Sequence, residues 1–372
     1  MKKKDMPNCH YSDYLQLGKL LDSQKPESKR YGSEAHDETL FIIVHQAYEL
    51  WFKQILHEIS YVMSVFAKPS VNEEALGVVN SLLDRVITIQ NVLIQQLDVM
   101  ETMTPLDFLD FRDYLVPASG FQSIQFKKIE IFLGLKSEQR IGFDQESFYR
   151  RLRPHEREEL IALEKAPNLF NHVNDWLERT PFLEDDAFKF WEAYHQAVIA
   201  MLAHDEEIIK KNTNLSEKEK TLQIINLNTT RHSFEYLSND RLFEEQQQQG
   251  VFRFSHPAML AAVFINLYRD EPIIHQPFRF LTSLVKIDEQ FTTWRYRHAL
   301  MVNRIIGKKI GTGGSSGQAY LQQTTENNRF FPDLFNLSTF LIPRSALPKL
   351  PETLRAKLGF YFNAGTRCQN NN

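Results

Sequence analysis

The sequence has few of the residues that break helices or cross-link chains. Its 372 residues include 14 glycines, 15 prolines and two cysteines, Cys9 and Cys368. So little glycine and proline argues against a loop-rich β-sandwich and favours long helices. Two cysteines near opposite ends make no disulfide framework, and two thiols alone cannot form a structural zinc site. We therefore expect a protein of the reducing cytoplasm.

The sequence also lacks a strong charge of one sign and a long apolar run. The formal net charge is −4, so there is no basic field to hold nucleic acid. The longest apolar stretches, residues 40–44 and the mixed residues 257–268, fall short of the ~20 residues that a membrane span needs. The basic residues 1–4 are followed by Asp5 and no apolar run, so we expect no signal peptide and no membrane partner.

The sequence does contain helical periodicity over most of its length. Apolar residues recur at three- and four-residue steps from residue 37 to about residue 66. Further helices are expected at 73–101, after Pro105, at 119–135, 188–211, 257–268 and 278–306, with shorter ones in 137–182 and one inside a loose N-terminal arm. The glutamine-rich residues 244–250 predict a mobile loop. Because no strand–helix alternation occurs, the expected fold class is all-α.

Two histidines occupy apolar stretches. His45 follows five apolar residues, where its neutral form is favoured and it can make one hydrogen bond with little competition from water. His298 shares a helix face with Trp294 and Met301, which suits an axial ligand under a haem. The nearby arginines are candidates to meet anionic propionates: Arg295, Arg297 and Arg304. For each histidine the alternative is a packed core side chain.

Arg112 lies among Phe108, Phe111 and Leu115, and a cation beside so much apolar surface needs an anionic partner. One hypothesis is an internal ion pair with Asp110 or Asp113. The other is that the planar guanidinium binds a substrate carboxylate.

Residues 311–317 hold four glycines, which let the backbone approach a ligand closely. No Walker or complete Rossmann pattern is present. The segment does include Gly313, Ser315 and Gly317 in the spacing of a nucleophile elbow. An α/β serine hydrolase centred on Ser315 is therefore an alternative, although the strand that should precede the elbow is missing.

Several segments together resemble the tryptophan 2,3-dioxygenase family. The segments are HDE at 36–38, FIIVHQAYELW at 41–51, PASGFQS at 117–123, WRYRH at 294–298 and GTGGSSG at 311–317, with YSDYL at 11–15, WLERTP at 176–181 and LFNLST at 334–339. They follow the family's order and reach from about residue 11 to about residue 345. Residues 205–250 match poorly, and Phe108 stands where some members carry tyrosine.

The resemblance implies an all-helical haem dioxygenase that cleaves the indole C2–C3 bond of L-tryptophan with O₂, giving N-formyl-L-kynurenine in the first step of the kynurenine pathway. It implies a homotetramer with one haem b per subunit, an arm at 1–36 reaching a neighbouring subunit, a catalytic domain with a small helical insert at 37–345, and a tail at 346–372.

The resemblance also implies roles for individual residues. His298 matches the histidine that ligates the haem iron, and His45 matches the distal histidine facing the indole N–H. The other substrate-binding positions are Phe41, Ile42, Ile43, Val44, Phe108, Arg112, Thr312, Tyr11 and Tyr14, and the other cofactor-binding positions are Ser119 and Gly120. A haem-binding sensor that has lost catalysis is the remaining alternative.

Overall fold

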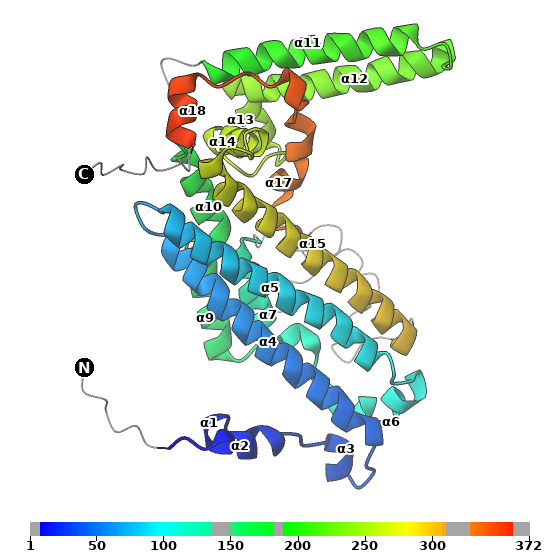
Figure 1. The fold of residues 1–372 in the computed structure, drawn as a ribbon. Coiled ribbons are helices and arrows are strands. Elements are labelled where there is room, and N and C mark those ends of the chain that lie inside the picture. The colour runs from blue at the N-terminus through cyan, green and yellow to red at the C-terminus, as the bar shows by residue number, and fades with distance from the viewer. Residues whose placement is uncertain are drawn as a thin grey trace, which may run out of the picture.

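The computed structural model describes residues 8–135, 149, 152–181, 189–307, 309 and 328–359. Within these ranges all the regular structure is helical and no residue lies in a strand, so the predicted all-α class is confirmed (Figure 1). Among the helices of the described ranges, none is both long and apolar enough to cross a membrane.

Three long helices run side by side through the body of the molecule (Figure 1): α4 (His36–Phe66), α5 (Glu73–Met100) and α15 (Pro272–Ile306). Their apolar stripes meet because residues three and four apart share one face of a helix. Asn72 begins α5 by accepting the backbone N–H of Ala75. The sequence predicted α4 and α5 to within one residue at each end. It placed the start of α15 six residues late, since the helix begins at Pro272 and includes Pro277.

Shorter helices close one side of these three: α6 (Pro105–Leu115), α7 (Ile124–Leu133), α9 (Pro154–Lys165) and α10 (Leu169–Glu178). The helix expected from residue 119 begins later, because the Ser123 side chain caps α7 by accepting the N–H of Phe126. Residues Gly120–Gln122 instead form the 3₁₀ turn η1. Gly134 ends α7 with φ 98°, and a Cβ there would lie 2.5 Å from the Cβ of Phe170. Only glycine fits this crossing of α7 and α10.

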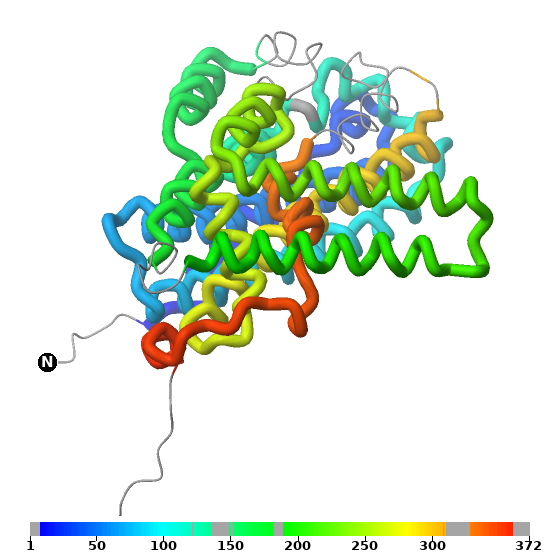
Figure 2. The backbone as a smooth tube through the Cα atoms, turned by 90° about the horizontal axis from the view of Figure 1, so that it is seen from above, coloured from blue at the N-terminus to red at the C-terminus, as the bar shows by residue number. Residues whose placement is uncertain are grey.

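The insert forms a helical hairpin that projects from the body, with α11 (Phe190–Lys211) and α12 (Glu217–Ser238) side by side (Figures 1 and 2). It is followed by α13 (Asp240–Gln248) and α14 (His256–Leu267). The mobile loop expected at 244–250 is wrong, because α13 continues through Gln248. Burial of Phe243 and the 2.8 Å hydrogen bond from the Gln247 amide to the Phe254 carbonyl hold this polar segment as a helix.

The C-terminal part adds α17 (Pro332–Asn336), the 3₁₀ turns η3 (Leu337–Phe340) and η4 (Arg344–Ala346), and α18 (Glu352–Leu358). The stretch expected to be a tail thus contains a helix, and two of its side chains, Leu354 and Leu358, are buried.

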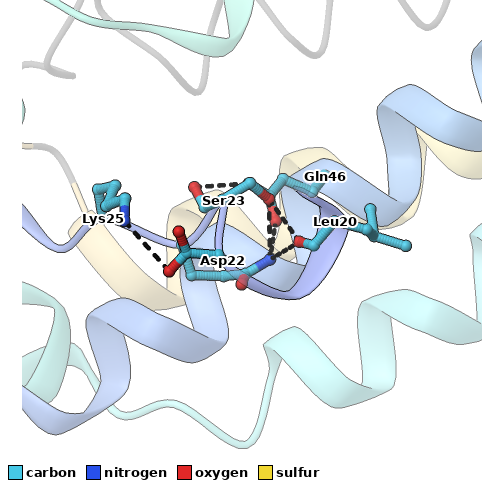
Figure 3. Close-up of polar contacts among 6 residues, drawn as sticks. Leu20, Asp22, Ser23, Lys25 and Gln46 are labelled. Atoms are coloured by element: carbon cyan, nitrogen blue, oxygen red, sulfur yellow. Dashed lines mark hydrogen bonds and ion pairs between the residues drawn. The ribbon is translucent and has the colours of Figure 1, made fainter. Parts of the chain in front are cut away.

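The arm carries three short helices rather than one: α1 (Tyr11–Tyr14), α2 (Leu17–Leu21) and α3 (Glu27–Arg30). Polar contacts tie it to α4. The buried Glu38 carboxylate accepts the backbone N–H groups of Glu27 and Ser28, at 2.8 and 2.9 Å. Further along α4, the Gln46 side chain meets Ser23 (Figure 3), with its amide nitrogen 3.3 Å from the serine hydroxyl. The start of α4 is therefore fixed by the arm.

Candidate active site

His45 lies on α4 with its ring held in one orientation. Its Nδ1 is 2.7 Å from the carbonyl oxygen of Phe41, one turn earlier. A carbonyl can only accept, so Nδ1 carries the proton and Nε2 keeps its lone pair as an acceptor. Desolvation lowers the pKa of His45, and the bond to Phe41 and the charge of Glu49 oppose this only in part. The neutral form therefore prevails at neutral pH.

The His45 side chain is also solvent-accessible. The protein thus desolvates the ring on one side and leaves it accessible to a ligand on the other.

His298 lies on α15 and stacks on Trp294, one turn earlier, with ring centroids 5.0 Å apart and planes 6° from parallel. Desolvation, together with the effect of a protonated His45, lowers the pKa of His298 to about 4. The two rings are thus near enough for protonation of one to disfavour protonation of the other. No hydrogen bond to the His298 ring comes from any residue that the structure describes, and the ring is half-buried.

A haem needs a neutral imidazole whose nitrogen is not already engaged, on an element rigid enough to hold it. His298 provides these properties on a helix of 35 residues. His45, on α4, is a second neutral ring with its own hydrogen bond to Phe41. The residues present therefore fit a haem.

Aromatic rings form a wall beside His45. The Phe41 ring lies 4.1 Å from the His45 ring, and it packs on Phe108 at 5.8 Å and on Phe111 at 5.5 Å. Phe108 and Phe111 meet edge to face at 5.4 Å. This geometry suits aromatic packing and leaves an apolar surface next to one hydrogen-bond acceptor.

The other residues expected from α4 point in different directions. Ile42 is half-buried on the side of His45, Ile43 is 48% exposed, and Val44 is 4% exposed in the core. Four consecutive helical residues cannot line one site, since each turns about 100° from the last. The structure therefore brings Phe41, Ile42 and His45 to one side and directs Val44 inward.

Arg112 lies on α6, the helix that also carries Phe108 and Phe111, so the cation and the aromatic wall share one support. A capping box between Thr104 and Asp107 fixes the start of α6. The Arg112 side chain is 19% exposed, and its Nη1 lies 3.9 Å from the carboxylate of Asp113, which is 89% exposed. An ion pair with a separation of 3.9 Å to a solvent-exposed carboxylate contributes little to stability.

The structure places the remaining expected residues as follows. Tyr11 and Tyr14 are 71% and 75% exposed on α1, away from α6 of the same chain (Figure 1). Ser119 donates its backbone N–H to the Gln122 side chain at 3.2 Å, and Gly120 has open space where a Cβ would stand. Thr312 and the whole of 311–317 lie outside the described residues.

The expectation that nearby arginines meet haem propionates is wrong for Arg295. Its side chain is 4% exposed and binds the buried Glu130 at 3.0 Å. Arg297 pairs with Asp98 at 2.6 Å, and Arg304 lies 3.8 Å from Glu101. The positions of these arginines along α15 could not predict their partners, because the partners lie on α7, on α5 and at the residue that follows α5.

One contact beside the site had no signal in the sequence. The Gln125 amide on α7 donates to both the backbone carbonyl and the carboxylate of Glu49, each at 2.8 Å. Glu49 follows His45 by one turn of α4. This contact joins the segment after Ser119 and Gly120 to the helix that carries His45.

The sequence as a whole is similar to known proteins of one family. A family model described as Tryptophan 2,3-dioxygenase matches residues 1–341. The chain is 52% identical to a tryptophan 2,3-dioxygenase of Alteromonas mediterranea, over 96% of this chain and 99% of that one. It is 49% identical to one of Bdellovibrio bacteriovorus, with the same coverage. It is also 44% identical to tryptophan 2,3-dioxygenase B of Danio rerio, over 91% of this chain and 84% of that one.

Proposed function

Because the chain belongs to the tryptophan 2,3-dioxygenase family, we propose that His298, His45 and Arg112 form the active site with which it carries out that family's reaction. The protein is an oxidoreductase that cleaves the indole ring of L-tryptophan with O₂ to N-formyl-L-kynurenine, in tryptophan catabolism by the kynurenine pathway. The observation that carries the proposed site is a pair of nearby histidines on α4 and α15, both kept neutral by desolvation.

The family is one of haem enzymes, and one haem b per subunit is the proposed cofactor. Bound haem iron supplies the binding and activation of O₂. His298 would hold the iron, since its ring is neutral at neutral pH and has no hydrogen bond among the described residues. His45 would not ligate the iron, because a coordination position must stay free for O₂; its ring, 4.1 Å from that of Phe41 in the aromatic wall, would serve the substrate.

The substrate is held at both ends. The Nε2 lone pair of His45 accepts the indole N–H, while Phe41 and Phe108 pack against the ring. Arg112 binds the carboxylate with its planar guanidinium. Thr312, outside the described residues, is proposed for the amino-acid end. A bound ligand without the N–H covers this acceptor and leaves it unpaired, which costs about 1–3 kcal/mol.

The arm is proposed to complete a neighbouring subunit's site in a homotetramer. Tyr11 and Tyr14 are exposed on α1, as side chains that bind elsewhere must be. The proposed division is an arm at 1–36, a dioxygenase domain at 37–345 and a tail at 346–372, in a cytoplasmic protein. The serine-hydrolase alternative is wrong, since its chemistry requires a sheet and the described part of the chain has no strand.

An absorption spectrum tests this proposal. The purified protein is reduced under nitrogen and recorded before and after L-tryptophan and air are added. A Soret band with rising product absorbance is expected. A Soret band without product would favour a haem sensor, and no Soret band after haem reconstitution would remove His298 as ligand. His298→Ala should lose haem, whereas His45→Ala should keep it.

A further inference from the structure

Four residues on one face of α15 form a stripe that ends at His298. Asp288, Phe291, Arg295 and His298 follow one another at steps of three, four and three residues, so they share one face of the helix. The first three all contact the same short segment, residues 328–331. His298 is the next position of the stripe.

Arg295 joins α15 to two neighbours at one point. Its Nη1 donates to the carbonyl of Asn328 at 2.7 Å, and its Nη2 donates to the Glu130 carboxylate at 3.0 Å. Both charged side chains are 4% exposed. Glu130 lies on α7 and also receives the Lys127 ammonium at 2.9 Å. The buried guanidinium is therefore matched by a carboxylate and a carbonyl on different elements.

Asp288 and Phe291 hold the same segment two turns and one turn earlier. One carboxylate oxygen of the buried Asp288 accepts the backbone N–H groups of Phe330 and Phe331, each at 3.0 Å. The Phe330 ring meets the Phe291 ring edge to face at 5.6 Å. The Arg295 guanidinium lies 5.2 Å from the centroid of the Phe330 ring. Backbone and side-chain contacts thus clamp this segment against the stripe.

We propose that Arg295 is a positioning residue for the reaction: its two-way contact with Glu130 and Asn328 fixes the rotation of α15 about its axis, and so the direction of the His298 ring. The inference rests on the proposed role of His298. A side-chain tip lies roughly 6 Å from the helix axis, so a rotation of about 10° moves it by about 1 Å. That displacement exceeds the ~0.5 Å tolerance of a working site.

The test is Arg295→Gln in the full haem-loaded chain. We expect haem to be retained, the iron–histidine stretching band in the resonance Raman spectrum of the ferrous protein to shift or broaden, and kcat to fall about 10- to 100-fold. KM for L-tryptophan should stay within about twofold, because no substrate contact is removed. Arg295→Lys keeps the charge without the planar fork and should restore only part of kcat.

Arg279→Gln is the matched control. It removes an arginine from the same helix and one ion pair to Asp84 at 2.9 Å, far from His298. It should change neither the band nor kcat. An unchanged band and kcat in folded Arg295→Gln would overturn the proposal, and so would an equal change in Arg279→Gln.

If Arg295→Gln does not fold, Glu130→Gln takes its place, since its amide oxygen still accepts from Arg295 while the ionic part is lost. A smaller band shift in the same direction is expected, and no shift would overturn the proposal. Amide hydrogen exchange of the chain without haem separates this inference from the proposed function. Arg295→Gln should speed exchange at Phe330 and Phe331 even if the wild-type chain bound no haem, and unchanged exchange would contradict the clamp.

Discussion

Replacing His45 by alanine tests the best-defined contact of the proposed site. The 2.7 Å bond from Nδ1 to the Phe41 carbonyl leaves Nε2 as an acceptor, so wild-type protein should prefer a ligand that offers an indole N–H. Leaving that acceptor unpaired costs about 1–3 kcal/mol. At 1.4 kcal/mol for each factor of ten, this is a discrimination of about 5- to 150-fold against N1-methyltryptophan.

The assay is a spectral titration of the haem-loaded protein with L-tryptophan and with N1-methyltryptophan. In His45→Ala the ratio of the two dissociation constants should fall to within about threefold, because N1-methyltryptophan no longer leaves an acceptor unpaired and L-tryptophan loses its hydrogen bond. His57→Ala, at an exposed histidine of the same helix, should leave both titrations unchanged. If His45→Ala kept the full discrimination, the tautomer argument and the proposed contact would both be wrong.

Three further predictions concern binding and stability. Arg112→Ala should weaken L-tryptophan binding more than tryptamine binding in the same titration, and equal loss for both would contradict a carboxylate contact. Gly134→Ala should lower the free energy of unfolding in urea by about 2–5 kcal/mol, from left-handed backbone strain of about 1–2 and overpacking against Phe170 of about 1–3, and a loss below about 1 would refute the close approach. Desolvation raises the pKa of Asp288, so this group's stabilising contribution is present below its ordinary pKa and lost as pH rises through the raised value. As the pH rises above the ordinary carboxyl pKa, the wild-type chain should therefore lose more stability than Asp288→Asn in parallel urea titrations, and parallel pH profiles would contradict this.

The long helices could be predicted because their signal is local. Apolar residues at three- and four-residue steps mark α4 and α5 whatever they pack against. The prediction failed at 244–250, where the sequence is polar and only tertiary contacts identify a helix. There Phe243 stacks on Phe252 at 4.5 Å, a contact that apolar periodicity along one helix does not predict. The start of α15 was also predicted too late, since the helix already includes residues 272–277 with Pro277 among them.

The candidate site was likewise predictable only in part. His45, His298 and Arg112 lie in contiguous sequence motifs, which can be recognised without knowing the fold. The residues that surround them in space come from distant parts of the chain and could not be predicted. The proximity of the two histidines depends on how α4 and α15 both pack against α5, and the partner of Arg295 comes from α7.

The sequence by itself thus determined the helical class, the family and the chemical groups of the site, because periodicity and motifs are properties of neighbouring residues. Only the tertiary structure decided that Arg295 faces Glu130 instead of a propionate, and that His298 has a lowered pKa. Burial and partner geometry belong to pairs of residues far apart in the chain. The free energy of a buried charge or ring nitrogen is set by those pairs and not by the residue type.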